Sequence, residues 1–293
     1  MGGWLRWMFA LILPVVMIIA MNPLYAGGRF PTGKFIVEPE RHQLGMGVKK
    51  VQGTADFQKL SDFPRNDDNY QLGTRVGHLT MGRGMCSGSL VGPDLFLTNH
   101  HCSVDGDERS FAPDVYRVYM EYWRDGKRGP VSSRVSQVLK SNEELDYALL
   151  KLDQPIGRKY GWLELERDTA ARRAKAVKII QHPQGRSKEI VLKNTSMVRV
   201  MPSVAHYMAD TEGGSSGSPV FNLYGDKIIA LHHVGTNRYN EGVMIDRIYT
   251  EIRSYLPKRS SSGGGSRSGS QPTPRPSQPV SGDLGGMLGQ DGW

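Results

Sequence analysis

From Gln71 to about Leu256 the chain is patterned in short apolar runs, separated by turns rich in Gly, Pro, Asn and Asp. The run 115–120 has the two-residue alternation of a half-buried strand. Many short strands with turn signals between them are typical of an all-β barrel or sandwich. The predicted strands are 89–91, 95–98, 115–120, 147–152, 177–180, 190–192, 219–221 and 228–231.

Two segments interrupt this pattern and predict helices. Residues 168–178 are rich in Ala and Arg, and residues 246–256 place Ile248, Ile252 and Tyr255, with Leu256, on one face. The chain is therefore predicted to be mostly β with a terminal helix at the end of its folded part.

The first 26 residues have the pattern of a signal peptide. Arg6 precedes an apolar run at 8–21 that only Pro14 interrupts, and Ala26 supplies a small residue at a plausible cleavage point. The run of about 14 residues is shorter than the roughly 20 needed to span a bilayer, so cleavage is favoured over an uncleaved anchor. We expect a secreted or periplasmic protein with no stable membrane span after signal cleavage.

The remaining chain divides by composition. Residues 27–70 are mixed and polar and are predicted to be an N-terminal arm or propeptide, 71–257 form the folded domain, and the Gly-, Ser- and Pro-rich segment 258–293 is predicted to be a disordered tail. The hydrophobic fraction of 38% over 293 residues supports a packed core and excludes a mostly disordered chain. The net charge of +8 is scattered without aromatic interleaving, which argues against nucleic-acid binding.

Export changes the interpretation of the two cysteines, Cys86 and Cys102. In an oxidising compartment one disulfide between them is the natural outcome. A metal site built from these thiols and nearby histidines is the alternative, but their spacing does not match a zinc pair. No metal is expected.

Three segments contain the residue types of nucleophilic catalysis. They are a His-His pair before Cys102, the aspartate Asp146 before an apolar run, and the Gly-flanked serines of 213–218. A serine hydroxyl needs a base to take its proton, and an imidazole titrates near neutrality. A carboxylate fixes the imidazole tautomer, and flanking glycines let backbone N–H groups converge on an oxyanion.

These segments resemble the chymotrypsin-like serine peptidases, above all the bacterial branch that includes the glutamyl endopeptidases. The resemblance covers roughly Gln71 to Leu256. It rests on the strings Thr98-Asn-His-His-Cys102, Asp146-Tyr-Ala-Leu-Leu150, His182-Pro-Gln-Gly185 and Gly214-Ser-Ser-Gly-Ser-Pro-Val-Phe221. It implies an all-β fold of two six-stranded antiparallel β-barrels, at about 71–160 and 161–257, with a C-terminal helix.

The same resemblance implies the roles of individual residues. His101 is the base, Asp146 orients it, and Ser216 is the nucleophile. The backbone N–H groups of Gly214 and Ser216 form the oxyanion hole, and Cys86–Cys102 ties the histidine loop to the neighbouring strand. The expected protein is a serine-type endopeptidase that acts on polypeptides through an acyl-enzyme, as a monomer and without a cofactor.

Specificity remains open at this point, because the predicted pocket residues Asp210, Thr211, His232 and Gly235 carry conflicting signals. His232 falls where the glutamyl endopeptidases place the histidine that meets an acidic side chain, and Thr211 can add a hydroxyl, so the resemblance favours cleavage after Glu. Asp210 lies where trypsin-like enzymes hold an aspartate, and a carboxylate there would attract Arg or Lys instead. We favour Glu. A non-catalytic binding protein on the same fold is a further alternative.

The other histidines are expected to have no part in the reaction. His42, His78 and His206 are predicted to be structural or exposed. His100 and His233 adjoin candidate residues and are expected to point away on alternate strand faces.

Overall fold

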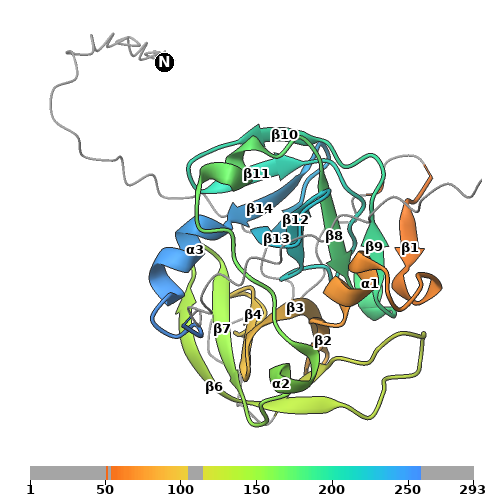
Figure 1. The fold of residues 1–293 in the computed structure, drawn as a ribbon, viewed down its shortest axis with the longest axis vertical. Helices are drawn as coiled ribbons and strands as arrows, with labels where there is room; N and C mark the ends of the chain where they lie inside the picture. Colours follow the sequence, from red (N-terminus) through yellow and green to blue (C-terminus); the bar gives the residue numbers. More distant parts are fainter. Residues whose placement is uncertain (1–50, 52–53, 105–114, 259–293) are drawn as a thin grey trace, which may run out of the picture.

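The computed structural model describes residues 51, 54–104 and 115–258 (Figure 1). The predicted signal peptide, the first part of the predicted arm and nearly all of the predicted tail lie outside the described residues. Within the described part of the chain, no helix has the length and apolar character needed to cross a membrane.

The first half of the domain is a closed six-stranded antiparallel barrel, in the order β2-β3-β4-β7-β6-β5. Its strands are β2 (Val76–Met81), β3 (Gly84–Gly92), β4 (Leu95–Thr98), β5 (Tyr116–Tyr119), β6 (Ser132–Asn142) and β7 (Tyr147–Leu152). Alternation along β5 buries Tyr116 and Val118 in the barrel core beside Phe96 and Leu150. The structure confirms the predicted first barrel.

The second half is an eight-stranded antiparallel sheet, in the order β1-β9-β8-β12-β13-β14-β11-β10. Its strands are β1 (Phe57–Lys59), β8 (Val177–Gln181), β9 (Glu189–Val191), β10 (Met197–Val200), β11 (Val204–Tyr207), β12 (Pro219–Asn222), β13 (Ile228–Gly235) and β14 (Asn240–Met244). It differs from the predicted closed barrel of six: β1, which comes from the N-terminal arm, pairs with β9 at one edge, and β10 pairs with β11 at the other.

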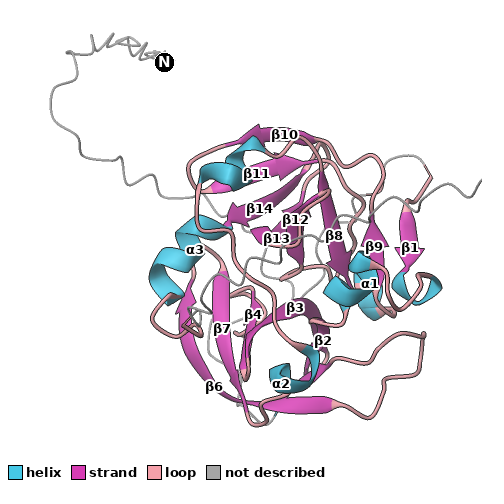
Figure 2. Ribbon diagram, in the orientation of Figure 1, coloured by secondary structure: helices cyan, strands magenta, loops and turns pink. Residues whose placement is uncertain are grey.

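The helices are few and short (Figure 2). The terminal helix is α3 (Ile245–Ile252), whose buried face is Ile245, Ile248 and Ile252, whereas Tyr255 lies beyond its end and is 43% exposed. The predicted helix at 168–178 is wrong. A 3-10 turn (Thr169–Arg173) stands at its start, and its end belongs to β8, because the β-branched residues of β8 are buried in the sheet. The other helical segments are η2 (Leu60–Asp62), α1 (Asp68–Gly73), α2 (Gly157–Tyr160) and η5 (Pro183–Gly185).

The barrel lies against the sheet (Figure 1), and residues of both halves share one buried apolar cluster. Leu97 and Leu149 of the barrel belong to the same buried cluster as Leu231 of β13 and Ile248 of α3. Burial of apolar surface therefore fixes the two halves relative to each other. The loop after β4, the β6–β7 turn and strand β13 all meet at this junction.

Candidate active site

Asp146 and His101 are in direct contact. The Nδ1 atom of His101 lies 2.9 Å from Oδ2 of Asp146 and 3.1 Å from Oδ1. The backbone N–H of His101 donates to Oδ1 of the same carboxylate at 3.1 Å. The carboxylate therefore fixes both the backbone and the ring of His101, and it favours the tautomer with a proton on Nδ1.

The turn between β6 and β7 holds Asp146 in this position. Its φ of 43° lies in the left-handed region, which Asp tolerates better than most residues. The side chain of Asn99 donates to the Asp146 carbonyl at 2.7 Å. Burial by itself raises the pKa of Asp146, but the N–H groups and charges of His101 and His233 outweigh it and hold that pKa well below its usual range.

A disulfide joins Cys86 of β3 to Cys102, the residue after His101, and confirms the predicted pairing. The two sulfur atoms and a ring nitrogen of His101 all lie within 4.8 Å of one another. Because both thiols are consumed in the bridge, this group has no thiolate to offer a metal ion. The bridge instead ties the histidine loop to β3.

The loop that carries Ser216 is anchored to the same strand. The backbone N–H of Ser87, next to Cys86, donates to the Ser216 carbonyl at 2.8 Å. The Ser87 hydroxyl donates to the Gly214 carbonyl at 2.9 Å. Two adjacent residues of β3 thus hold the histidine loop and the serine loop. The Ser216 hydroxyl makes no hydrogen bond to His101 among the described residues, and such bonds often tighten only when substrate binds.

Some of the backbone N–H groups of the serine loop make hydrogen bonds within the protein. The N–H of Ser215 donates to the Glu212 carbonyl and that of Gly217 to the His232 carbonyl. Within the described chain, the N–H groups of Gly214 and Ser216 have no such partner. Gly214 has a φ of 91°, a conformation that L side chains rarely adopt. These two donors are the pair expected to form an oxyanion hole.

His233 does not point away from the site, so this expectation is wrong. Its Nδ1 lies 3.3 Å from Oδ2 of Asp146, and its Nε2 lies 3.0 Å from Oε1 of Glu241 on β14. The other oxygen of Glu241 lies 2.7 Å from Nε2 of His206. The β13–β14 register shifts between His232 and Val234. Such a bulge re-aims a side chain, and strict alternation along the strand fails there.

His232, the predicted specificity residue, is buried, and one of its ring nitrogens is hydrogen-bonded within the protein. Its Nδ1 lies 2.7 Å from the hydroxyl of Tyr207 on β11. Burial lowers the pKa of His232 to about 3, with His233 and His101 adding to the effect, so the ring is neutral at physiological pH. Gly235, the last residue of β13, is buried and pairs with Asn240.

Asp210 and Thr211 are both engaged within the protein. The Asp210 carboxylate accepts the backbone N–H of Asp56 at 2.6 Å, which ties the N-terminal arm to this loop. The Thr211 hydroxyl donates to the side chain of Asn240 at 2.8 Å, so its proton is already used. Both residues are at most 5% exposed. The structure thus places Thr211 beside Asn240, the pairing partner of Gly235, and it engages the polar groups of both Asp210 and Thr211.

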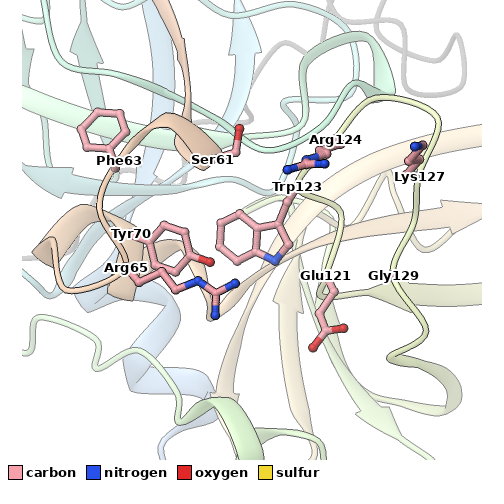
Figure 3. Close-up of a pocket in the computed structure, with 9 residues that line it drawn as sticks. All are labelled: Ser61, Phe63, Arg65, Tyr70, Glu121, Trp123, Arg124, Lys127 and Gly129. Atoms are coloured by element: carbon pink, nitrogen blue, oxygen red, sulfur yellow. The ribbon is translucent and has the colours of Figure 1, made fainter.

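A separate hollow of about 370 Å³ lies at the β5–β6 loop and the N-terminal arm (Figure 3). Tyr70 and Trp123 stack on its wall with ring centroids 4.6 Å apart. Its lining residues are Ser61, Phe63, Arg65, Tyr70, Glu121, Trp123, Arg124, Lys127 and Gly129. None of them belongs to the His101–Asp146 site.

Comparison with known proteins points to the family that the sequence resembles. The profile of the trypsin-like peptidase domain matches residues 86–231. Secreted RxLR effector protein 73 of Plasmopara viticola is 32% identical over 219 residues, covering 67% of this chain and 54% of that protein. Glutamyl endopeptidase of Bacillus licheniformis is 27% identical over 218 residues, covering 68% of this chain and 66% of that protein.

This chain thus spans between half and two thirds of the length of these two relatives, 54% and 66%. A solved structure of a Glu endopeptidase in complex with MPD superposes with a TM-score of 0.58 at 23% identity, covering 70% of this chain and 98% of that one. The fold, the sequence motifs and the relatives all point to the same family. The chain therefore belongs to the chymotrypsin-like serine peptidases, in the branch that includes the glutamyl endopeptidases.

Proposed function

We propose that this protein is an exported serine endopeptidase that hydrolyses peptide bonds through Ser216, His101 and Asp146. The observation that carries the proposal is the double attachment of His101 to Asp146, through ring and backbone, at 2.9 and 3.1 Å. A histidine held in this way presents Nε2 as a base. Export is supported by the signal-peptide pattern at 1–26 and by the Cys86–Cys102 disulfide.

In the proposed reaction, the Ser216 hydroxyl attacks the scissile carbonyl and its proton passes to Nε2 of His101. Asp146 stabilises the imidazolium that forms. The N–H groups of Gly214 and Ser216 donate to the oxyanion, and His101 then protonates the leaving amine. Water activated by His101 hydrolyses the acyl-enzyme and restores the free hydroxyl.

For specificity we propose cleavage after Glu, with His232 as the residue that meets the acidic side chain. With Nδ1 of His232 occupied by Tyr207, Nε2 is the nitrogen left for a substrate carboxylate. The trypsin-like alternative needs Asp210 to receive a basic side chain, yet that carboxylate already accepts a backbone N–H from Asp56 at 2.6 Å. This bond weighs against cleavage after Arg or Lys.

The catalytic assignment is tested with Ser216→Ala. The variant should fold normally and lose peptide hydrolysis, whereas Ser136→Ala on the exposed part of β6 serves as the matched control and should keep wild-type activity. Circular dichroism checks the fold of both variants. Hydrolysis by Ser216→Ala at the wild-type rate would refute the proposal. Failure of the wild type to react with a serine-directed phosphonate would favour a non-catalytic binding protein.

Specificity is tested by profiling cleavage of a peptide library with the wild type, His232→Gln and Asp210→Asn. We expect cuts after Glu in the wild type, loss of that preference in His232→Gln, and its retention in Asp210→Asn. Wild-type cuts after Arg or Lys that disappear in Asp210→Asn would establish the trypsin-like alternative instead.

A further inference from the structure

The carboxylate of Asp146 is shared between two imidazoles. Its Oδ2 atom lies 2.9 Å from Nδ1 of His101 and 3.3 Å from Nδ1 of His233. His101 belongs to the barrel half of the domain, whereas His233 comes from β13 of the sheet. A triad requires only the first of these contacts, so the second imidazole needs its own explanation.

Both ring nitrogens of His233 face carboxylates. Nδ1 faces Asp146 and Nε2 lies 3.0 Å from Glu241, and the side chain is only 8% exposed. A neutral imidazole has a single N–H and would leave one carboxylate oxygen opposite an unprotonated nitrogen. An imidazolium donates to both. The geometry therefore favours a charged His233, and in agreement Asp146 and Glu241 outweigh burial and raise the pKa of His233 to about 9.

Glu241 is itself shared between two imidazoles. Glu241 also contacts His206 of β11 at 2.7 Å, and the His206 ring stacks on Tyr239. Among the described residues, the chain neighbour His232 also interacts electrostatically with His233, and burial keeps the His232 ring neutral. The groups around His233 are therefore two carboxylates, Asp146 and Glu241, the imidazoles His101 and His206 that share them, and the neutral ring of His232.

We propose that His233 is a positioning residue of the reaction: its charged ring, held between Asp146 and Glu241, fixes the Asp146 carboxylate and offsets its charge, and thereby sets the acid limit of activity. A lone aspartate favours the imidazolium form of the catalytic histidine. A second cation on the same carboxylate weakens that effect. The acid limb of activity is then expected at a lower pH than with Asp146 alone. The inference rests on the proposed role of His101.

The test compares pH profiles of kcat/KM for the wild type, His233→Gln and Glu241→Gln. Loss of the His233 charge should move the acid limb up by about one pH unit, which means roughly tenfold lower kcat/KM at a fixed pH below the limb. Glu241→Gln removes only one of the two carboxylates that hold the His233 charge, so His233 should stay largely charged beside Asp146 and the limb should move far less than in His233→Gln. His78→Gln is the control, because it removes a buried imidazole that is kept neutral and contacts Tyr122 and His182 instead.

A purely structural role for His233 would lower kcat/KM equally at every pH and leave the limb in place, which would overturn the inference. A readout without turnover is the titration of the His101 ring by NMR in a Ser216→Ala background, with and without His233→Gln or Glu241→Gln. A midpoint that His233→Gln does not move upward refutes the role of His233 while leaving the proposed peptidase intact. Retained hydrolysis by Ser216→Ala alone would refute the proposed peptidase itself.

Discussion

At the residue scale, Asp146 carries more interactions than its predicted role requires. Its carboxylate accepts the backbone N–H and the ring of His101 and also contacts His233, while its own carbonyl accepts from Asn99. A side chain amide in its place would present an N–H₂ group toward one of these donors. The geometry of His101 and its tautomer therefore depend together on the Asp146 carboxylate.

We expect Asp146→Asn to lower kcat by about 10⁴ with little loss of fold, the size of effect known for the corresponding change in the serine-protease template. Asp153→Asn is the matched control, because Asp153 lies just beyond β7 and pairs with Ser133 and Arg134 away from the site. Steady-state kinetics on one peptide substrate measures both. A loss below tenfold in Asp146→Asn would contradict the assignment.

Gly214 provides a second prediction at this scale. Its φ is 91°, and a Cβ at this position would lie 2.7 Å from the carbonyl oxygen of His182. Gly214→Ala must therefore displace the backbone N–H that we assign to the oxyanion, and kcat should fall by about 10²–10³.

The control for Gly214→Ala is Gly82→Ala in the β2–β3 turn. Gly82 also has a positive φ, of 60°, but a Cβ there would meet nothing within 4 Å. This variant should lose about 1 kcal/mol of stability and keep its activity. Equal kcat values for the two variants would mean that Gly214 has no special role.

At the scale of elements, β3 organises the site although it contributes no catalytic side chain. Cys86 holds the loop of His101 through the disulfide, and Ser87 holds the loop of Ser216 through two hydrogen bonds. The serine loop lies directly against this strand, because a Cβ on Gly217 would clash with the Ser87 carbonyl oxygen. The strand thus fixes the histidine and serine loops from one side.

Removal of the disulfide tests this arrangement. The double change Cys86→Ala and Cys102→Ala should lower the free energy of unfolding by about 3 kcal/mol in the chain-entropy model, which denaturant unfolding measures. Activity at a temperature well below the midpoint should fall as well, because the histidine loop loses its covalent tie to β3. An unchanged unfolding midpoint would show that the bridge does not constrain the chain.

At the scale of the whole molecule, the ion pairs that His233 makes with Asp146 and Glu241 link the two halves of the domain. Asp146 belongs to the barrel, and His233 and Glu241 belong to the sheet. The pKa of His233 is raised to about 9 from 6.5, so its contribution to stability is fully present below pH 6.5 and is lost as pH rises through 9. His233 and His206 lower the pKa of Glu241 to about 2 against the effect of burial, so its contribution is present above pH 4.5 and is lost as pH falls through 2.

We therefore expect the difference in Tm between the wild type and His233→Gln to be largest near pH 6 and to shrink by pH 9.5. Thermal unfolding followed by circular dichroism at these two pH values measures it. The part of the difference that remains at high pH reports lost packing. A difference that stays constant with pH would contradict an imidazolium at position 233.

Local sequence was sufficient for four of the six barrel strands, for half of the strands in the sheet and for the terminal helix. Its errors came from tertiary context. The Ala- and Arg-rich stretch at 168–178 has helical propensity, but burial of Val177 and its neighbours in the sheet converts its end into β8. Strand β1 is only three residues long, and its partner β9 lies far along the chain, so no local pattern indicates it.

The sequence by itself determined the chemistry offered: an imidazole, a carboxylate and a Gly-flanked serine in separate short strings, and two cysteines for one bridge. These are properties of residue type and local order. Only the tertiary structure decided which groups meet. The β13 bulge turned His233 toward Asp146, and the arm brought the N–H of Asp56 to Asp210, because contacts between distant segments depend on register, bulges and packing that no local window contains.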